Sequence, residues 1–146
     1  MAKQQINSSQ AKMTVIDSNF ALSGTRYATS SATFADVTNI SHSIINTSAS
    51  ACNAILTMTI MAQKSGGGAE GACRITVNGV AYGSEVYYNP ATSDWVRGTM
   101  NAVIPIPAGA TIAVKLQARS VGVGTFSVVN ETANWMPKLT GMVVGA

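Results

Sequence analysis

The chain has 146 residues, of which 10% are charged and 47% are hydrophobic, and its net charge is +3 at pH 7. One domain of this length buries roughly 70% of the surface that its unfolded form exposes. The lysines and arginines are spread along the chain without a basic run, and no apolar segment suits a signal peptide or a membrane span. We therefore expect cytoplasmic synthesis, no nucleic-acid partner and no membrane partner. With so little charge, part of the surface is expected to be covered by another chain.

Residues 1–29 are the first unit predicted along the chain. They are polar and weakly periodic, with one short strand expected at 13–16 and a Ser/Thr-rich link after residue 24. Two interpretations are open: a disordered tail, or an extended N-terminal arm that orders on a neighbouring subunit. In the second, the arm would bind its partner through its apolar side chains, which are Met13, Val15, Ile16, Phe20 and Leu22.

From residue 30 onward, side chains alternate between apolar and polar with period two, and no long window shows the period of a helix. Turn signals divide the alternating runs, and the sharpest is Asn78–Gly79, which is typical of a type I′ hairpin. The predicted strands are 33–37, 40–46, 54–64, 72–77, 80–88, 95–104, 110–120, 125–129 and 135–144. Eight or nine such strands predict an all-β fold for residues 30–146, an antiparallel β-sandwich of jelly-roll type.

The alternation also predicts which side chains fill the core. The inward residues are Leu56, Met58, Ile60, Ala62, Cys73, Ile75, Val77, Ile112, Val114, Leu116, Ala118, Phe126 and Val128. On the opposite face of the strand at 110–120 lie Thr111, Lys115, Gln117 and Arg119, which are free to meet a partner. The last strand is apolar on both faces, so we expect Met142 and Val144 to be covered by the sheet centre or by another subunit.

Residues that could carry chemistry are few. His42 is the only histidine, and it shares the parity of Ile40 and Ile44, which places it on an apolar strand face or at a subunit contact. Cys52 and Cys73 are expected as free thiols, with a bridge between them as the alternative. One histidine and six carboxylates offer no catalytic triad and no metal-ligand spacing. We therefore expect no enzyme, no cofactor and no metal.

An aromatic cluster surrounds the turn at 89–94, and its members are Tyr82, Tyr87, Tyr88 and Trp95. Exposed rings of this kind stack on sugars or anchor interfaces. The alternative is that these rings simply pack the sandwich. Two interpretations of this cluster therefore stay open: the rings pack the core or a subunit interface, or they form a platform for a ligand.

Five segments resemble a jelly-roll domain common in virion proteins of tailed phages: TSSATFADVTNISHSI (29–44), AILTMTIMA (54–62), RITVNGVAYGS (74–84), PAGATIAVKLQARSVGVGTFSV (107–128) and LTGMVV (139–144). The resemblance implies a fold close to the trimeric jelly rolls of the tumour-necrosis-factor type, and a structural or adhesive role in the virion. The segment WVRGTMNAVIPIP (95–107) departs from the family pattern, and no repetitive shaft precedes the domain.

The resemblance leads to one main expectation of function. The chain is expected to be a non-enzymatic capsid decoration, or cement, protein, a homotrimer that binds the major capsid protein and stabilises its lattice. The first alternative is a tail-tip or tail-fibre module that recognises cell-surface glycans through the aromatic cluster. The second is a polysaccharide hydrolase that acts through Asp94 or Glu85.

Overall fold

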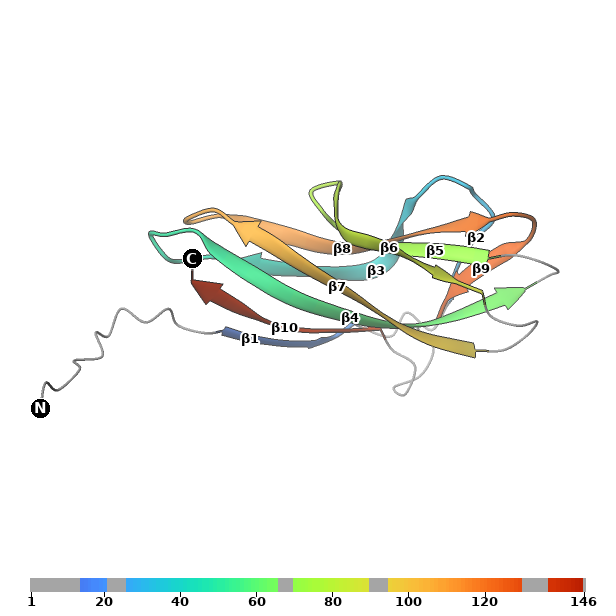
Figure 1. The fold of residues 1–146 in the computed structure, drawn as a ribbon, viewed down its shortest axis with the longest axis horizontal. Helices are drawn as coiled ribbons and strands as arrows, with labels where there is room; N and C mark the ends of the chain where they lie inside the picture. The colour runs from blue at the N-terminus through green and yellow to red at the C-terminus, as the bar shows by residue number, and fades with distance from the viewer. Residues whose placement is uncertain (1–13, 21–25, 66–69, 90–94, 130–136, 146) are drawn as a thin grey trace, which may run out of the picture.

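The computed structural model describes residues 14–20, 26–65, 70–89, 95–129 and 137–145, and within these ranges every regular element is a β-strand. Figure 1 shows an elongated molecule made of two layers of strands. The strands are β1 (Thr14–Asn19), β2 (Tyr27–Thr29), β3 (Ala35–Ile45), β4 (Cys52–Ser65), β5 (Glu70–Val77), β6 (Val80–Tyr88), β7 (Trp95–Ile106), β8 (Thr111–Val121), β9 (Thr125–Val128) and β10 (Lys138–Gly145).

The strands form two antiparallel sheets, which we name sheet A and sheet B. Sheet A has six strands in the order β1-β10-β4-β9-β2, with β7 also paired to β4, and sheet B has four in the order β3-β8-β5-β6. The long strand β4 pairs with β7 along one edge, and with β10 and then β9 along the other. Sheet A is therefore four strands wide over much of its length.

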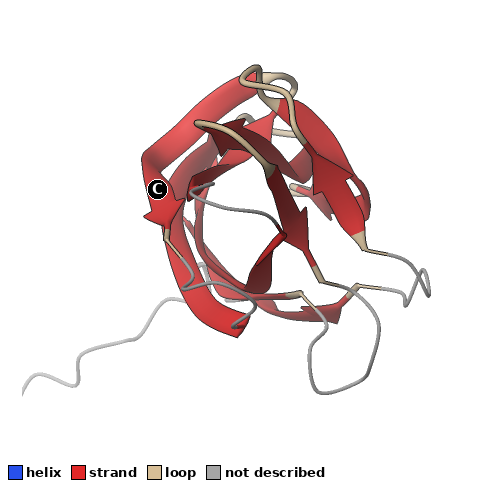
Figure 2. Cartoon of the chain, turned by 90° about the vertical axis from the view of Figure 1, so that its right-hand side faces the viewer, coloured by secondary structure: helices blue, strands red, loops and turns tan. Residues whose placement is uncertain are grey.

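Strands that follow one another in sequence often change sheet. From β3 to β9 the chain runs through sheets B, A, B, B, A, B and A. Viewed along the strands, the two sheets curve around a shared interior (Figure 2). This confirms the predicted all-β fold, an antiparallel β-sandwich of jelly-roll type.

The interior holds the residues that the alternation placed inward. Each predicted core residue is at most 5% exposed, and Phe126, Leu116 and Met58 are among the largest of the fully buried side chains. Apolar side chains from both sheets meet there because every second residue of a strand points to the same face.

The strands predicted at 33–37 and 40–46 form a single strand, β3. A register shift between Asp36 and Ser41 interrupts its pairing with β8, and Asn39 has a positive φ of 64°. This irregularity turns both Val37 and Ile40 into the core. A β-bulge of this kind adds residues to one strand without ending it, which is why a turn-like sequence lies inside a strand.

The hairpin between β5 and β6 has the predicted type I′ turn, because φ is 51° at Asn78 and 83° at Gly79. A second irregularity follows in β6. The register passes from Ile75↔Tyr82 to Cys73↔Val86, so that β6 contributes extra residues, and Gly83 there has a φ of 75°. This bulge shifts the register by two residues and so places Tyr87 opposite Ala72.

Candidate functional site

The outer face of sheet B gathers charged side chains from all four of its strands. Asp36 comes from β3, Arg74 from β5, Glu85 from β6, and Lys115 and Arg119 from β8. They point away from the core because the apolar residues that alternate with them point into it. Together with Tyr87 and Gln117 they form one connected set, which we call the polar network.

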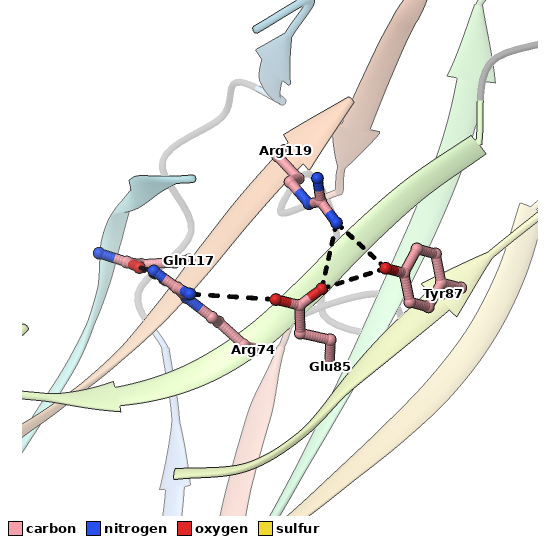
Figure 3. A network of polar contacts seen from close by, with 5 residues as sticks. All are labelled: Arg74, Glu85, Tyr87, Gln117 and Arg119. Atoms are coloured by element: carbon pink, nitrogen blue, oxygen red, sulfur yellow. Dashed lines mark hydrogen bonds and ion pairs between the residues drawn. The ribbon is translucent and has the colours of Figure 1, made fainter. Parts of the chain in front are cut away.

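Glu85 is the centre of this network (Figure 3). Its Oε2 atom accepts hydrogen bonds from Arg119 Nη2 at 3.2 Å and from the Tyr87 hydroxyl at 3.2 Å, and Arg119 Nη2 also donates to the Tyr87 oxygen at 3.1 Å. Its Oε1 atom lies 4.0 Å from Arg74 Nη1. Arg74 donates from Nε and Nη2 to Gln117 Oε1 at 3.0 and 2.8 Å. Three side chains, those of Arg119, Tyr87 and Arg74, thus surround the Glu85 carboxylate, and Glu85 and Arg119 hold the exposed Tyr87 phenol.

The network continues to the edge strand β3. Gln117 Nε2 donates to Asp36 Oδ1 at 2.8 Å, and Lys115 Nζ donates to Asp36 Oδ2 at 2.6 Å. The hydrogen bond from Lys115, followed by the one from Gln117, lowers the pKa of Asp36 below its ordinary value. This carboxylate is therefore held in its charged form.

Two aromatic rings hold the arginines in place. The Cζ atoms of Arg74 and Arg119 lie 4.0 and 4.9 Å from the ring centroid of Phe34, and Arg119 Cζ lies 5.9 Å from that of Tyr87. At these distances a guanidinium is attracted to the face of an aromatic ring. The arginines are therefore oriented by stacking as well as by hydrogen bonds.

The outer face of sheet A is different, because apolar side chains are exposed on it. Val15, Met142, Ile55 and Val103 are successive cross-strand partners on β1, β10, β4 and β7, and they form one line across the sheet, which we call the apolar row. Their exposed fractions are 70%, 39%, 45% and 59%. Four neighbouring apolar side chains are thus exposed to solvent on this face.

The rows on either side of the apolar row carry little charge. On one side Val144, Asn53 and Pro105 face the same way, and on the other Thr140, Thr57 and Asn101 do so. Charge enters this second row only at its edge, where Asp17 on β1 forms an ion pair with Lys138 Nζ at 2.9 Å. A second surface can therefore cover the apolar row without burying a charged side chain of that row.

The structure separates the predicted aromatic cluster. Tyr88 is buried against Phe126, Tyr82 is half-buried against the core, and Tyr87 is exposed in the polar network. Trp95 lies on the outer face of sheet A, where Arg26 stacks on its ring at 4.7 Å. The four rings do not form one platform, because neighbouring residues of a strand face opposite ways.

Other predicted contact residues lie on several surfaces. His42 is half-buried on β3 opposite Val114, with no side-chain hydrogen bond to another described residue. Met142 belongs to the apolar row, and Val144 is half-buried beside it. The structure brings Met142 together with Val15 from the predicted arm, but not with His42.

The described residues of the predicted arm are paired with sheet A. β1 is hydrogen-bonded to β10, and β2 to β9. Ile16 and Phe20 belong to the chain's own core, whereas Val15 is exposed. Met13 and Leu22 lie outside the described residues. Within this chain, then, Val15 is the described arm residue whose apolar side chain is free for a partner.

Cys52 and Cys73 are free and buried, as expected. Burial raises the pKa of the Cys73 thiol far above its ordinary value, so the thiol stays protonated. Within the described ranges no three His, Cys, Asp or Glu side chains gather as a metal site would need. The same ranges contain no helix that is long and apolar enough to cross a membrane.

Sequence reasoning placed Lys115, Gln117 and Arg119 on an outward face but missed their partners. Arg74 has the parity of an outward residue, which alternation could have revealed. Phe34 and Asp36 could not have been assigned, because their partners on β8 follow from the order of strands in sheet B.

No protein-family model matches the sequence, and the curated proteins contain no match either. Among solved structures the chain is similar to two from infectious bursal disease virus. For the Gx strain the identity is 14% over 92% of this chain and 38% of that chain, with a TM-score of 0.42. For a mutant VP2 protein in derived T=1 particles the identity is 11% over 100% of this chain and 41% of that chain, with a TM-score of 0.44. The chain spans about two fifths of each of these proteins.

Proposed function

We propose that this chain is a non-enzymatic structural protein of a virion, a homotrimeric decoration protein that binds and stabilises the lattice of the major capsid protein. The observation that carries the proposal is the apolar row on sheet A. A virion role and the number of three subunits come from the sequence resemblance to phage and trimeric jelly rolls.

The outer face of sheet A suits burial between subunits. A face four strands wide and as long as the β4–β7 register covers roughly 800 Å², which is about what each partner contributes to a stable interface. The apolar row lies within this face and holds no charge. Copies of the same chain can pack there without repulsion between like charges.

Val103 and Val80 offer a matched pair of variants that tests the subunit contact. Both are strand valines of similar exposure, 59% and 60%, but Val103 is in the apolar row and Val80 is beside the β5–β6 turn in sheet B. Val103→Lys is expected to convert trimers to monomers in sedimentation equilibrium, whereas Val80→Lys leaves them intact. If the wild-type protein were a monomer at all concentrations, the trimer proposal would be wrong. If both variants changed the trimer–monomer equilibrium equally, the subunit contact would not be at the apolar row.

The capsid role needs a separate test. Decorated capsids are expected to resist heat better than bare ones, and the protein to be present in copy numbers comparable to the capsid protein. Low copy number with no thermal difference would favour a tail position instead. A deletion that tests the arm should stop at residue 13, because removing residues 1–22 would also remove β1, Ile16 and Phe20 from the chain's own fold.

A further inference from the structure

Tyr87 is an exposed ring that the protein holds still. Its side chain is 57% exposed, and among the described aromatic residues no other falls in the exposed class. Its hydroxyl is nevertheless tied to Glu85 and Arg119 by the hydrogen bonds of the polar network. A ring that is fixed before binding loses little conformational entropy when a ligand stacks on it.

Unused donors and acceptors lie beside this ring. Arg119 donates through Nη2, while its Nη1 atom has no acceptor among the described residues. Glu85 Oε1 is 4.0 Å from Arg74 Nη1, which is too long for a hydrogen bond. A cationic donor and a charged acceptor therefore flank one exposed aromatic face.

The charges of the network leave a positive excess. It contains the cations of Arg74, Lys115 and Arg119, but only the carboxylates of Asp36 and Glu85. One more carboxylate can pair with Arg119 through Nη1, because Nη2 already donates to Glu85 and Tyr87 and Nε is buried. The stacking of Arg119 between Phe34 and Tyr87 already orients its guanidinium plane.

We propose that the Tyr87 end of the polar network binds a saccharide that bears a carboxylate. The apolar face of the sugar ring stacks on Tyr87, its carboxylate pairs with Arg119, and a hydroxyl donates to Glu85 Oε1. An acidic protein surface fits less well, because a broad negative patch would meet both Asp36 and Glu85. A single sugar carboxylate at Arg119 lies near Glu85 but not near Asp36, which is at the other end of the network.

This binding is independent of the proposed assembly role, because it uses sheet B while the apolar row is on sheet A. The two proposals therefore fail separately. Loss of the trimer leaves the Tyr87 surface in place, and loss of saccharide binding leaves the apolar row.

The experiment is an amide chemical-shift titration of the whole chain with a galacturonate tetramer and, separately, with its fully methyl-esterified form. Both probes have the same sugar backbone, and only the first carries charge. The acid form is expected to perturb residues around Tyr87, Glu85 and Arg119 and to bind at least about tenfold more tightly than the ester.

Three variants locate the site. Tyr87→Ala and Arg119→Lys are each expected to weaken binding about tenfold, the first by removing the stacked ring and the second by removing the stacked guanidinium with its Nη1 donor. Lys115→Gln is the matched control, because it removes one positive charge from the same strand and face at the opposite end of the network. It is expected to change affinity less than about twofold at 0.15 M salt. Thermal unfolding of each variant confirms that it is folded.

Several outcomes overturn the proposal. Equal binding of the ester removes the role of the carboxylate. Weakening by Lys115→Gln without weakening by Arg119→Lys, which keeps the charge, means that diffuse charge attracts the probe. Absence of any shift up to the solubility of the acid tetramer means that the surface is a solvated sheet face.

Discussion

The ring of Tyr88 stacks on the ring of Phe126 in the core, with 6.1 Å between centroids and 27° between planes. Each ring lies where a neighbouring strand carries glycine. A Cβ atom on Gly98 would collide with the Tyr88 ring, and one on Gly71 would collide with the Phe126 ring. The pair joins β6 of sheet B to β9 of sheet A, and the two glycines make room for it.

Gly98→Ala is expected to lower the free energy of unfolding by about 1–3 kcal/mol, because the added methyl group overpacks the core against Tyr88. Denaturant unfolding measures the change. Thr99→Ala, at the exposed residue next along β7, is the control and should cost less than about 0.5 kcal/mol. If the two variants were equally stable, Tyr88 would not fill the space over Gly98.

The Tyr88 hydroxyl is buried without a hydrogen-bond partner among the described residues. Burial, and then the neighbouring Cys73, raise the pKa of this phenol. Tyr88→Phe keeps the ring stack and removes the buried polar atom, so stability is expected to stay the same or to rise by about 1 kcal/mol. Calorimetry provides the measurement, and a loss of about 2 kcal/mol or more would show that the hydroxyl makes a stabilising contact.

Asp36 is expected to make stability depend on pH. Its pKa is lower in the folded chain because Lys115 and Gln117 donate to the carboxylate, so folding favours the charged form. The stabilisation is present above the unfolded-state pKa of about 3.9 and is lost as pH falls through the lower folded-state value. Unfolding at pH 7 and at pH 2 measures it.

Because this ion pair is about half exposed, its contribution at pH 7 is expected to be below about 1 kcal/mol. Lys115→Met should raise the pKa of Asp36, as followed by carboxyl carbon NMR. An unchanged Asp36 titration in that variant would contradict the assigned cause of the shift.

Asn46 fastens the β3–β4 loop to the end of β7. Its side-chain Nδ2 atom donates to the carbonyl oxygens of Ser50, Ile106 and Pro107 at 2.9, 3.2 and 2.9 Å. Its Oδ1 atom accepts a hydrogen bond from the Ser48 backbone amide at 3.0 Å. Asn46→Ala is expected to cost about 2–3 kcal/mol, because buried carbonyls lose their donors. Asn101→Ala, on the exposed face of sheet A, is the matched control. Equal unfolding midpoints for the two variants would refute this role.

Local alternation was enough to predict the sandwich and its inner residues. Residues such as Leu116 and Phe126 face the core because period two is a property of the single strand. Pairing between distant strands is not readable in this way. The network around Glu85 depends on β6 lying beside β5 and on the bulge at Gly83, and the apolar row depends on Val15 being placed opposite Met142.

The bulge in β3 shows the same limit. Val37 and Ile40 differ in parity, so alternation alone assigns them to opposite faces, and both are nevertheless buried. A positive φ at Asn39 makes this possible. Asn adopts such a conformation more readily than most residues, but the same residue is also typical of a turn between two strands.

The pairing of β1 with β10 links the first described strand of the chain to the last. During synthesis on the ribosome, β1 emerges before β10. Contacts between such distant segments slow folding. The β1 edge of sheet A can therefore be completed only after β10 has been made.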